Sequence, residues 1–580
     1  MRVYRLQVRR FRGFRDVTIA PKSHVLLVGE PRAGRSTVVE ALRRVLSPAA
    51  TRMPLLDDLD FYGRDTSRSI QIEVVLGALG NILEQEFFDQ LELWDDEARE
   101  VVRESPDPTL LDTEDTKFVL RLCYRAFWNE AEERADHWVD FPKLSDTATE
   151  SYARVPRRQL DLLPVVFVDQ SSRPLNFGAR SEFRRLVERA DGDDFSVALE
   201  NLMDSVETAA DAFTESDQVA AALDDVMGPL DTPVFQDRWQ SDRVRFVPEG
   251  GSLAGILRSL EPSLRLSRSL WLPLGRHGST VAEMLRSAEA LAAGVMQQAV
   301  CVVDDFGEGV DVAAAAHLSA TYRSAFAQVW LSTRRGQSGD AFPADEIVRL
   351  TRPRRGIGRV HQRASPRTRA DRVAARHLAV QLLSAISSRT LAVLEGPHDR
   401  AGLTAVALRR LDVAGEPLPA ASGISLVDAG AVDRSGGAVA AAKLATFARE
   451  LGFRVVVILD GDRAGDDAEA DAIAGSDAVV RLPTGAAIER VLVDGIARDD
   501  LLEALRGLQH SFSATLPANI ETLEPVQLRG AACDAIKSKG GLHAQFVELL
   551  PQGIVPPLAA RLLDTLMEAA HGRIDGVVTL

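Results

Sequence analysis

Two short acidic motifs in the last third of the chain stand directly after strand-like apolar runs. The run LAVL ends at Glu395, and Gly-Pro-His joins this residue to Asp399. The run VVVIL ends before Asp460, a glycine and Asp462. Side chains two residues apart in an extended chain point to the same side, and the carboxyl ends of parallel strands lie at one edge of a sheet. The spacing therefore predicts that these four carboxylates meet.

Four carboxylates without a nearby lysine would repel one another unless a divalent cation neutralised them. Oxygen-only ligands favour Mg²⁺ or Mn²⁺ over Zn²⁺. Such an ion activates water and stabilises a leaving oxygen, so phosphodiester cleavage is the simplest chemistry that the cluster predicts. The single acids that follow, Asp466 and Asp467, are interpreted instead as solvated turn residues.

A glycine-rich loop near the start of the chain follows the strand-like run VLLV and precedes the helix-like run VVEALRRVL. Gly29, Gly34 and Ser36 match the pattern G-x-x-x-x-G-K-[ST], in which backbone amides hold phosphates and the hydroxyl binds Mg²⁺. Arg35 replaces the lysine. It keeps the positive charge but spreads it over a planar group, which favours phosphate binding over close placement at the transferred phosphate. We therefore expect ATP and Mg²⁺ to bind at Gly29, Gly34, Arg35, Ser36 and Thr37.

Three later segments extend this interpretation. The apolar run VCVV ends at Asp304 and Asp305, the segment LGRHGST carries Ser279 ahead of a helix, and VWLST ends at Arg334. Asp304 is expected to hold the Mg²⁺ of the nucleotide through water. Asp305 stands where a longer glutamate would polarise the attacking water. Together with the opening FRGFRDVTI, the order and spacing of these segments resemble the RecF/SMC-like ABC ATPases.

That resemblance implies an ABC ATPase-like fold, with Ser279 in the signature loop that one subunit presents to its partner's nucleotide. Arg35, Asp305 and Arg334 depart from the family pattern, all at positions associated with hydrolysis. The resemblance therefore implies slow ATP turnover or purely regulatory nucleotide binding. A degenerate, nucleotide-free dimerisation domain remains an alternative.

The acidic motifs of the last third resemble the toprim domain, through Glu395 in EGPHD and through Asp460 and Asp462 in DGD. Toprim domains occur in topoisomerases, primases and certain nucleases. A topoisomerase needs a tyrosine nucleophile, but all five tyrosines precede this region. A bacterial-type primase brings a zinc module, which three scattered cysteines cannot supply. The nuclease interpretation remains.

An ABC ATPase followed by toprim resembles the OLD (overcoming lysogenization defect) nucleases, including the nuclease subunit of Gabija anti-phage systems. The resemblance implies that Glu489, in LPTGAAIERVL, is a further metal ligand. It also implies a late lysine, Lys537 or Lys539, that neutralises charge on the phosphate; Lys539 is preferred, and solvated helix-end charges are the alternative. The implied activity is DNA nicking or double-strand cutting in phage defence, restrained by nucleotide or by a partner such as a helicase-like protein.

The alternation of strand-like and helix-like runs predicts an α/β protein of several domains. The back part is expected to be Rossmann-like, with a parallel sheet covered by helices. We expect the following divisions: a first ATPase-like part in 1–175, a helical, dimerising insertion in 176–245, a second ATPase-like part in 246–350, an Arg-rich linker in 351–376, and a toprim domain with a C-terminal helical part in 377–580.

The net charge of −16 argues against a protein that coats nucleic acid non-specifically. Ten arginines nevertheless lie between Arg349 and Arg376, against the single acidic residue Asp371. This segment either meets a phosphate backbone or is a solvated linker. No signal peptide and no run of about 20 apolar residues is evident, so we expect a cytoplasmic protein without membrane contact.

The sequence thus predicts a homo-oligomer, at least a dimer, that acts on DNA. Two other classes remain as alternatives. A RecF-type repair ATPase with a vestigial toprim domain predicts vigorous ATP hydrolysis without nicking. A non-catalytic sensor scaffold predicts that cellular function survives the change Asp460→Ala.

Overall fold

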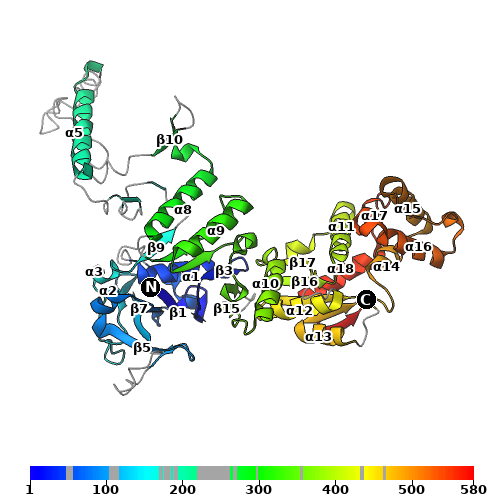
Figure 1. Ribbon diagram of the computed structural model, residues 1–580, viewed down its shortest axis with the longest axis horizontal. Helices are drawn as coiled ribbons and strands as arrows, with labels where there is room; N and C mark the ends of the chain where they lie inside the picture. Colours follow the sequence, from blue (N-terminus) through cyan, green and yellow to red (C-terminus); the bar gives the residue numbers. More distant parts are fainter. Residues whose placement is uncertain are drawn as a thin grey trace.

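A computed structural model describes most of the chain as an α/β protein with several sheets, one of them wholly parallel (Figure 1). Of the described helices, none is both long enough and apolar enough to span a membrane. The residues that the structure describes are 1–47, 56–102, 117–168, 174–175, 183–184, 187, 194–218, 262–265, 271–295, 298–352, 357–430, 437–461 and 466–580.

The chain opens with a hairpin that begins an antiparallel sheet. This sheet has the order β2-β1-β4-β7-β5-β6, with β8 paired to β7. Its apolar face packs on α1 (Arg35–Leu46), where Val38, Leu42 and Val45 are buried on the predicted helix face. Its strands are β1 (Arg2–Phe11), β2 (Phe14–Ile19), β4 (Ile70–Gly77), β5 (Leu91–Asp95), β6 (Glu100–Val101), β7 (Lys117–Asn129) and β8 (Arg134–Asp140).

A second front sheet carries the glycine-rich loop and has the order β15-β14-β3-β13-β12-β9. Its central strand β3 lies parallel to β13 and β14 and runs straight into the loop before α1, so the predicted order of strand, loop and helix is confirmed. One face meets α1 and the other meets α8 and α9. The elements are β3 (Val25–Gly29), β9 (Val165–Val168), β12 (Val300–Val303), β13 (Gln328–Ser332), β14 (Ile347–Thr351), β15 (Arg359–Gln362), α8 (Ser279–Val295) and α9 (Val312–Ala325).

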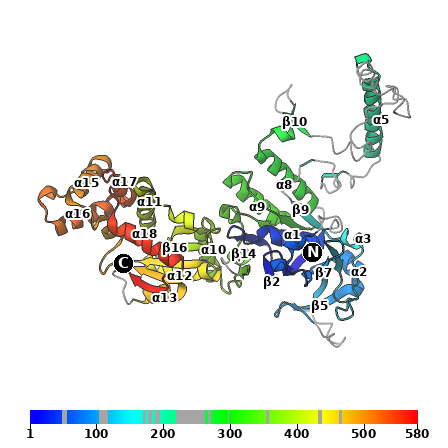
Figure 2. The same ribbon diagram turned by 180° about the vertical axis from the view of Figure 1, so that it is seen from behind.

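The back sheet is parallel throughout, with the order β17-β16-β18-β19-β20, and this confirms the predicted parallel sheet covered by helices. Alternate strand residues face opposite ways: Val393 and Val457 pack toward α12 and α13, whereas Ala392 and Val456 pack toward α11 and α14 to α18. Figure 2 shows the same two helical layers from behind. The strands are β16 (Thr390–Leu394), β17 (Ile424–Asp428), β18 (Arg454–Leu459), β19 (Ala478–Arg481) and β20 (Gly576–Thr579).

The helices of the back part begin with α10 (Arg369–Leu383), which lies between the two halves of the molecule in both views. The others are α11 (Pro397–Ala414), α12 (Gly437–Glu450), α13 (Asp467–Gly475), α14 (Ile488–Val493), α15 (Arg498–Phe512), α16 (Pro525–Lys537), α17 (His543–Glu548) and α18 (Pro557–Ala570).

The expected linker 351–376 is more regular than its Pro- and Arg-rich composition suggested. It contains β15, which pairs with β14, and the first half of α10. The helix starts at a capping box in which Thr368 Oγ1 accepts from the backbone N–H of Asp371 at 3.1 Å and Asp371 Oδ2 accepts from that of Thr368 at 3.2 Å. The segment expected as an Arg-rich linker thus includes a paired strand and the start of a helix, which its composition did not indicate.

Of the expected helical insertion 176–245, the structure describes mainly α5 (Asp194–Thr214), which stands apart from the sheets in Figure 1. Most of the remaining insertion lies outside the described residues. Its expected part in dimerisation stays a prediction.

One of the buried apolar clusters is continuous from the front sheet to the back sheet. A single buried cluster contains Leu26 and Leu331 of the front, Leu382 of α10, and Leu391 and Val457 of the back. Burial of this continuous core holds the two halves together, since apolar area removed from water is the main stabilising contribution in folding.

Candidate functional sites

The two acidic motifs do meet at the carboxyl edge of the back sheet, as their positions at strand ends predicted. Strands β16 and β18 are adjacent and parallel, so the residues that follow them, Glu395 and Asp460, leave the sheet side by side. Glu395 Oε1 accepts a hydrogen bond from the backbone N–H of Asp460 at 3.0 Å. Asp462 lies outside the described residues.

Asp399 lies in the first turn of α11, close to the same edge. Its Oδ2 accepts a hydrogen bond from the backbone N–H of Gly396 at 2.9 Å, which fixes the turn between Glu395 and the helix. Burial is the main cause that raises the pKa of Asp399 to about 6; the negative charges of Glu395 and Glu489 add to the rise, whereas the Gly396 N–H and His543 oppose it. Asp399 is therefore a buried carboxylate that has two other carboxylates nearby.

Glu489 brings a third segment to this cluster from the first turn of α14. Its Oε1 accepts a hydrogen bond from His543 Nε2 at 3.1 Å, and its Oε2 lies 3.4 Å from Lys537 Nζ. Burial by itself would raise the pKa of Glu489, but the hydrogen bond from His543 and the charge of Lys537 lower it overall. Glu489 is thus held ionised and in one orientation.

Of the two candidate lysines, Lys537 is the one for which the structure describes a contact with this site. Lys537 is the last residue of α16. Its side chain lies next to Glu489 and is 57% exposed. Lys539 follows in a short 3-10 turn, Ser538–Gly540, and its side chain lies outside the described atoms. The preference for Lys539 therefore stays a prediction.

His543 is a site residue that the sequence analysis missed. It is 3% exposed, bonds Glu489, and stacks on His398 with ring centroids 5.4 Å apart and planes 13° apart. Gly541 permits this packing, because a Cβ there would meet the His398 ring at 2.4 Å and its φ is +97°. In the sequence, the two consecutive glycines before a short helix were the feature that could have drawn attention to His543.

Most donors in this cluster are carboxylate oxygens, which are the ligands that Mg²⁺ and Mn²⁺ prefer. Burial is the main cause of the raised pKa of Asp399, and the neighbouring carboxylates add to it; a cation would offset their repulsion. Within the part of the chain that the structure describes, no three His, Cys, Asp or Glu side chains already stand in metal-binding geometry. A complete set of metal ligands would require Asp462 as a further ligand or a movement of the described side chains.

The front motifs also meet. Ser36 Oγ donates to Asp304 Oδ1 at 3.4 Å, so the glycine-rich loop and the end of β12 share one site. Burial and the adjacent Asp305 raise the pKa of Asp304, while hydrogen bonds from Ser332 and Ser36 oppose the rise. Gly34 has φ +104° and a Cβ there would meet the Phe14 ring at 2.6 Å, so this loop position requires glycine. Thr37 follows in the first turn of α1.

The three residues that depart from the ATPase pattern are engaged with protein groups. Arg35 Nη1 donates to the carbonyl of Gly29 at 2.7 Å, so its guanidinium turns back onto the loop. Arg334 Nη2 donates to Asp305 Oδ2 at 3.2 Å, an ion pair that ties the two hydrolysis-associated positions to each other.

Ser279 begins α8, which the structure holds against the loop after β12. Thr280 Oγ1 donates to the carbonyl of Gly309 at 2.7 Å. Buried Glu283 accepts from the backbone N–H groups of Gly307 at 2.8 Å and Gly309 at 2.6 Å. These bonds fix the start of the helix relative to Asp304 and Asp305, while a contact of Ser279 with a second subunit stays a prediction.

The chain matches no protein-family model and no curated protein. Among solved structures it is similar to the SmcHead in a crystal structure of the SmcHead bound to the C-winged helix domain of ScpA. That match has 13% identity and a TM-score of 0.33, and it covers 63% of this chain and 98% of the other.

Proposed function

We propose that the back part of this chain is a metal-dependent endonuclease of the toprim kind that cuts DNA. The observation that carries the proposal is the hydrogen bond from the Asp460 N–H to Glu395 Oε1 at 3.0 Å, which joins two acidic segments 65 residues apart. A second observation supports it: the negative charges of Glu395 and Glu489 both raise the pKa of Asp399, so these carboxylates interact electrostatically.

The residues assigned to the ion are Glu395, Asp399, Asp460, Asp462 and Glu489. When bound there, Mg²⁺ or Mn²⁺ would lower the pKa of a water molecule and offset charge on the scissile phosphate. His543 orients the Glu489 carboxylate through its Nε2 hydrogen bond. Lys537 places an exposed ammonium next to Glu489, where it can attract a phosphate oxygen.

For the front part we propose ATP binding with slow or no hydrolysis. Ser36 and Asp304, which are already in contact, would hold the Mg²⁺ of the nucleotide. The contacts of Arg35 with Gly29 and of Arg334 with Asp305 support weak turnover. The resemblance to OLD nucleases supports a homo-oligomer in phage defence, restrained by nucleotide or by a helicase-like or other defence-system partner.

Nicking of supercoiled plasmid tests the nuclease. Wild type, Asp460→Asn and the control Asp467→Asn are incubated with Mg²⁺ or Mn²⁺, each with and without ATP. Asp467 is an exposed residue in the first turn of α13 on the same segment, so its change removes equal charge outside the cluster. We expect metal-dependent nicking by wild type and Asp467→Asn only. Equal nicking by Asp460→Asn would refute the site assignment.

A further inference from the structure

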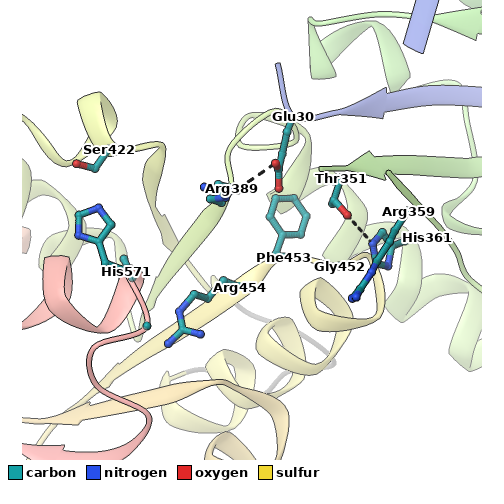
Figure 3. Close-up of a pocket in the computed structure, with 12 residues that line it drawn as sticks. Glu30, Thr351, Arg359, His361, Arg389, Ser422, Gly452, Phe453, Arg454 and His571 are labelled. Carbon is teal, nitrogen blue, oxygen red and sulfur yellow. Dashed lines mark hydrogen bonds and ion pairs between the residues drawn. The ribbon is translucent and has the colours of Figure 1, made fainter. Parts of the chain in front are cut away.

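A cavity of about 450 Å³ lies where the front and back sheets meet (Figure 3). The front contributes Glu30, just after β3, and residues of β14 and β15; the back contributes the segments before β16 and β18 and the end of α18. The volume is that of a site for a small molecule rather than a groove for a duplex.

This cavity is distinct from the carboxylate cluster. Arg389 precedes β16 and Arg454 begins β18, so both line the amino ends of the strands. Glu395 and Asp460 follow the carboxyl ends of the same two strands. A strand of five residues, such as β16, separates the two edges by roughly 17 Å at about 3.3 Å per residue.

Positive groups outnumber negative ones around the cavity, in a chain whose net charge is −16. One carboxylate, Glu30, faces it, and this carboxylate is shared between Arg349 at 3.9 Å and Arg389 at 4.0 Å. Both separations exceed a hydrogen bond, so neither arginine is firmly paired by Glu30. The lining cations and imidazoles are Arg359, Arg389, Arg454, His361 and His571.

The arginines of the lining differ in how far the protein already satisfies them. Arg454 donates to the carbonyls of Ala569 and Ile574 and pairs with Asp575. The side chain of Arg389 is 35% exposed and, among the described residues, donates to the carbonyl of Arg352 at 3.3 Å besides its distant approach to Glu30. The side chain of Arg359 is exposed and makes no hydrogen bond or ion pair with the residues that the structure describes.

His361 lies in the same positively charged environment. Its Nε2 lies 2.9 Å from Thr351 Oγ1, and burial together with the charges of Arg349 and Arg359 lowers its pKa. The ring packs directly on the turn before β18, where a Cβ at Gly452 would lie 2.4 Å from it. The His361 ring thus packs closely against one wall of the cavity, and Arg359 of β15 and Arg389, just before β16, lie on different sides of it (Figure 3).

We propose that this cavity binds a small phosphate-bearing anion, with Arg359 of the front sheet and Arg389 of the back segment as its principal ligands. Guanidinium groups suit phosphate because they donate two parallel, charge-assisted hydrogen bonds. The proposal is independent of the nuclease, since none of the carboxylates of the cluster lines the cavity.

Isothermal titration with sodium pyrophosphate, in buffer free of nucleotide and phosphate, tests the site. We expect wild type to bind, and Arg359→Gln and Arg389→Gln each to raise Kd on the order of tenfold through loss of charge-assisted bonds. The control Arg561→Gln removes an exposed arginine near the start of α18, away from the cavity, and should bind as wild type does.

Arg35→Ala separates this cavity from the glycine-rich loop, which is the other candidate phosphate site. Binding that persists in Arg35→Ala but weakens in Arg359→Gln supports the proposal. Binding lost in Arg35→Ala and unchanged in Arg359→Gln places the anion at the loop and overturns it, as does an absence of millimolar binding by wild type. Should Arg389→Gln unfold, Arg359→Gln still decides, because that exposed side chain bonds no other described residue.

Discussion

At the scale of single residues, the acidic site depends on side chains that orient its carboxylates through hydrogen bonds. His543 touches Glu489 and His398 but belongs to neither acidic motif. Residues that orient a metal-binding carboxylate act on metal affinity as well as on rate. We interpret His543 as such a positioning residue.

The change His543→Ala should therefore lower plasmid nicking by about 10- to 100-fold and raise the Mn²⁺ concentration needed for half-maximal nicking, because Glu489 loses its orienting donor. His543→Gln, which can still donate, should recover part of the metal response. Circular dichroism checks that both variants fold. An unchanged metal response in folded His543→Ala would show that the contact is only structural.

His24 provides a residue-scale prediction for pH. Its Nδ1 accepts from the backbone N–H of Val329 at 3.1 Å, which requires the neutral ring. Burial, with the charges of Arg323 and Arg2, lowers the pKa of His24 to about 4. The folded pKa lies below the unfolded one, so stability is present above pH 6.5 and is lost as pH falls toward 4.

Between pH 7 and pH 5 the contribution of His24 should fall by on the order of 1 kcal/mol, allowing for solvent screening. Denaturant unfolding of wild type and His24→Gln at both values measures it as the difference between their pH dependences. The comparison with the variant is needed because buried Glu346, whose pKa is raised to about 7 by burial, favours folding at the lower pH. Identical pH dependences would exclude the proposed role of the ring.

At the scale of secondary-structure elements, α10 begins at a capping box within a segment whose composition is that of a linker. Thr368→Ala removes the side-chain acceptor for the Asp371 N–H and should destabilise the fold by about 1 kcal/mol. A lower denaturant midpoint with an unchanged m-value would report this. Thr404→Ala is the matched control, since that exposed hydroxyl bonds only the carbonyl of Arg400 within α11 and should change stability little. Equal effects of the two changes would argue against the cap.

At the scale of the whole molecule, Arg349 joins the front and back halves. It is 0% exposed and donates to the carbonyls of Ile386 at 3.2 Å, Ser388 at 2.6 Å and Leu451 at 3.1 Å. Its guanidinium also lies 3.6 Å from the centroid of the Phe453 ring. One side chain of β14 thus satisfies three backbone acceptors of the back half.

Arg349→Ala should destabilise the protein by roughly 3–5 kcal/mol, because three backbone acceptors, two of them in buried hydrogen bonds, lose their donor. Arg349→Lys should not rescue it fully, since one ammonium cannot reproduce the planar fork. All six tryptophans precede residue 331, so tryptophan fluorescence follows the front half, whereas circular dichroism follows both halves. Thermal unfolding of the variant monitored by both signals would show whether the halves then unfold separately. The control Arg372→Ala, at an exposed position on α10, should leave stability nearly unchanged.

The sequence alone determined the local patterns of this protein. Apolar runs that alternate with helical segments predicted the parallel back sheet, and acids placed directly after two such runs predicted that Glu395 and Asp460 would be neighbours. Glycine spacing likewise predicted the loop between β3 and α1. These features were predictable because they follow from backbone geometry within short segments of the chain.

Only the tertiary structure decided which distant polar groups pair. Nothing in the sequence near His543 points to Glu489, and nothing near Arg349 points to three carbonyls of the back half or to a cavity beside Arg359. Whether a charged side chain is buried, and which group satisfies it, depends on chain segments brought together from far apart. Periodicity along one segment carries no record of such pairs, so the acids at the strand ends were predictable and their supporting residues were not.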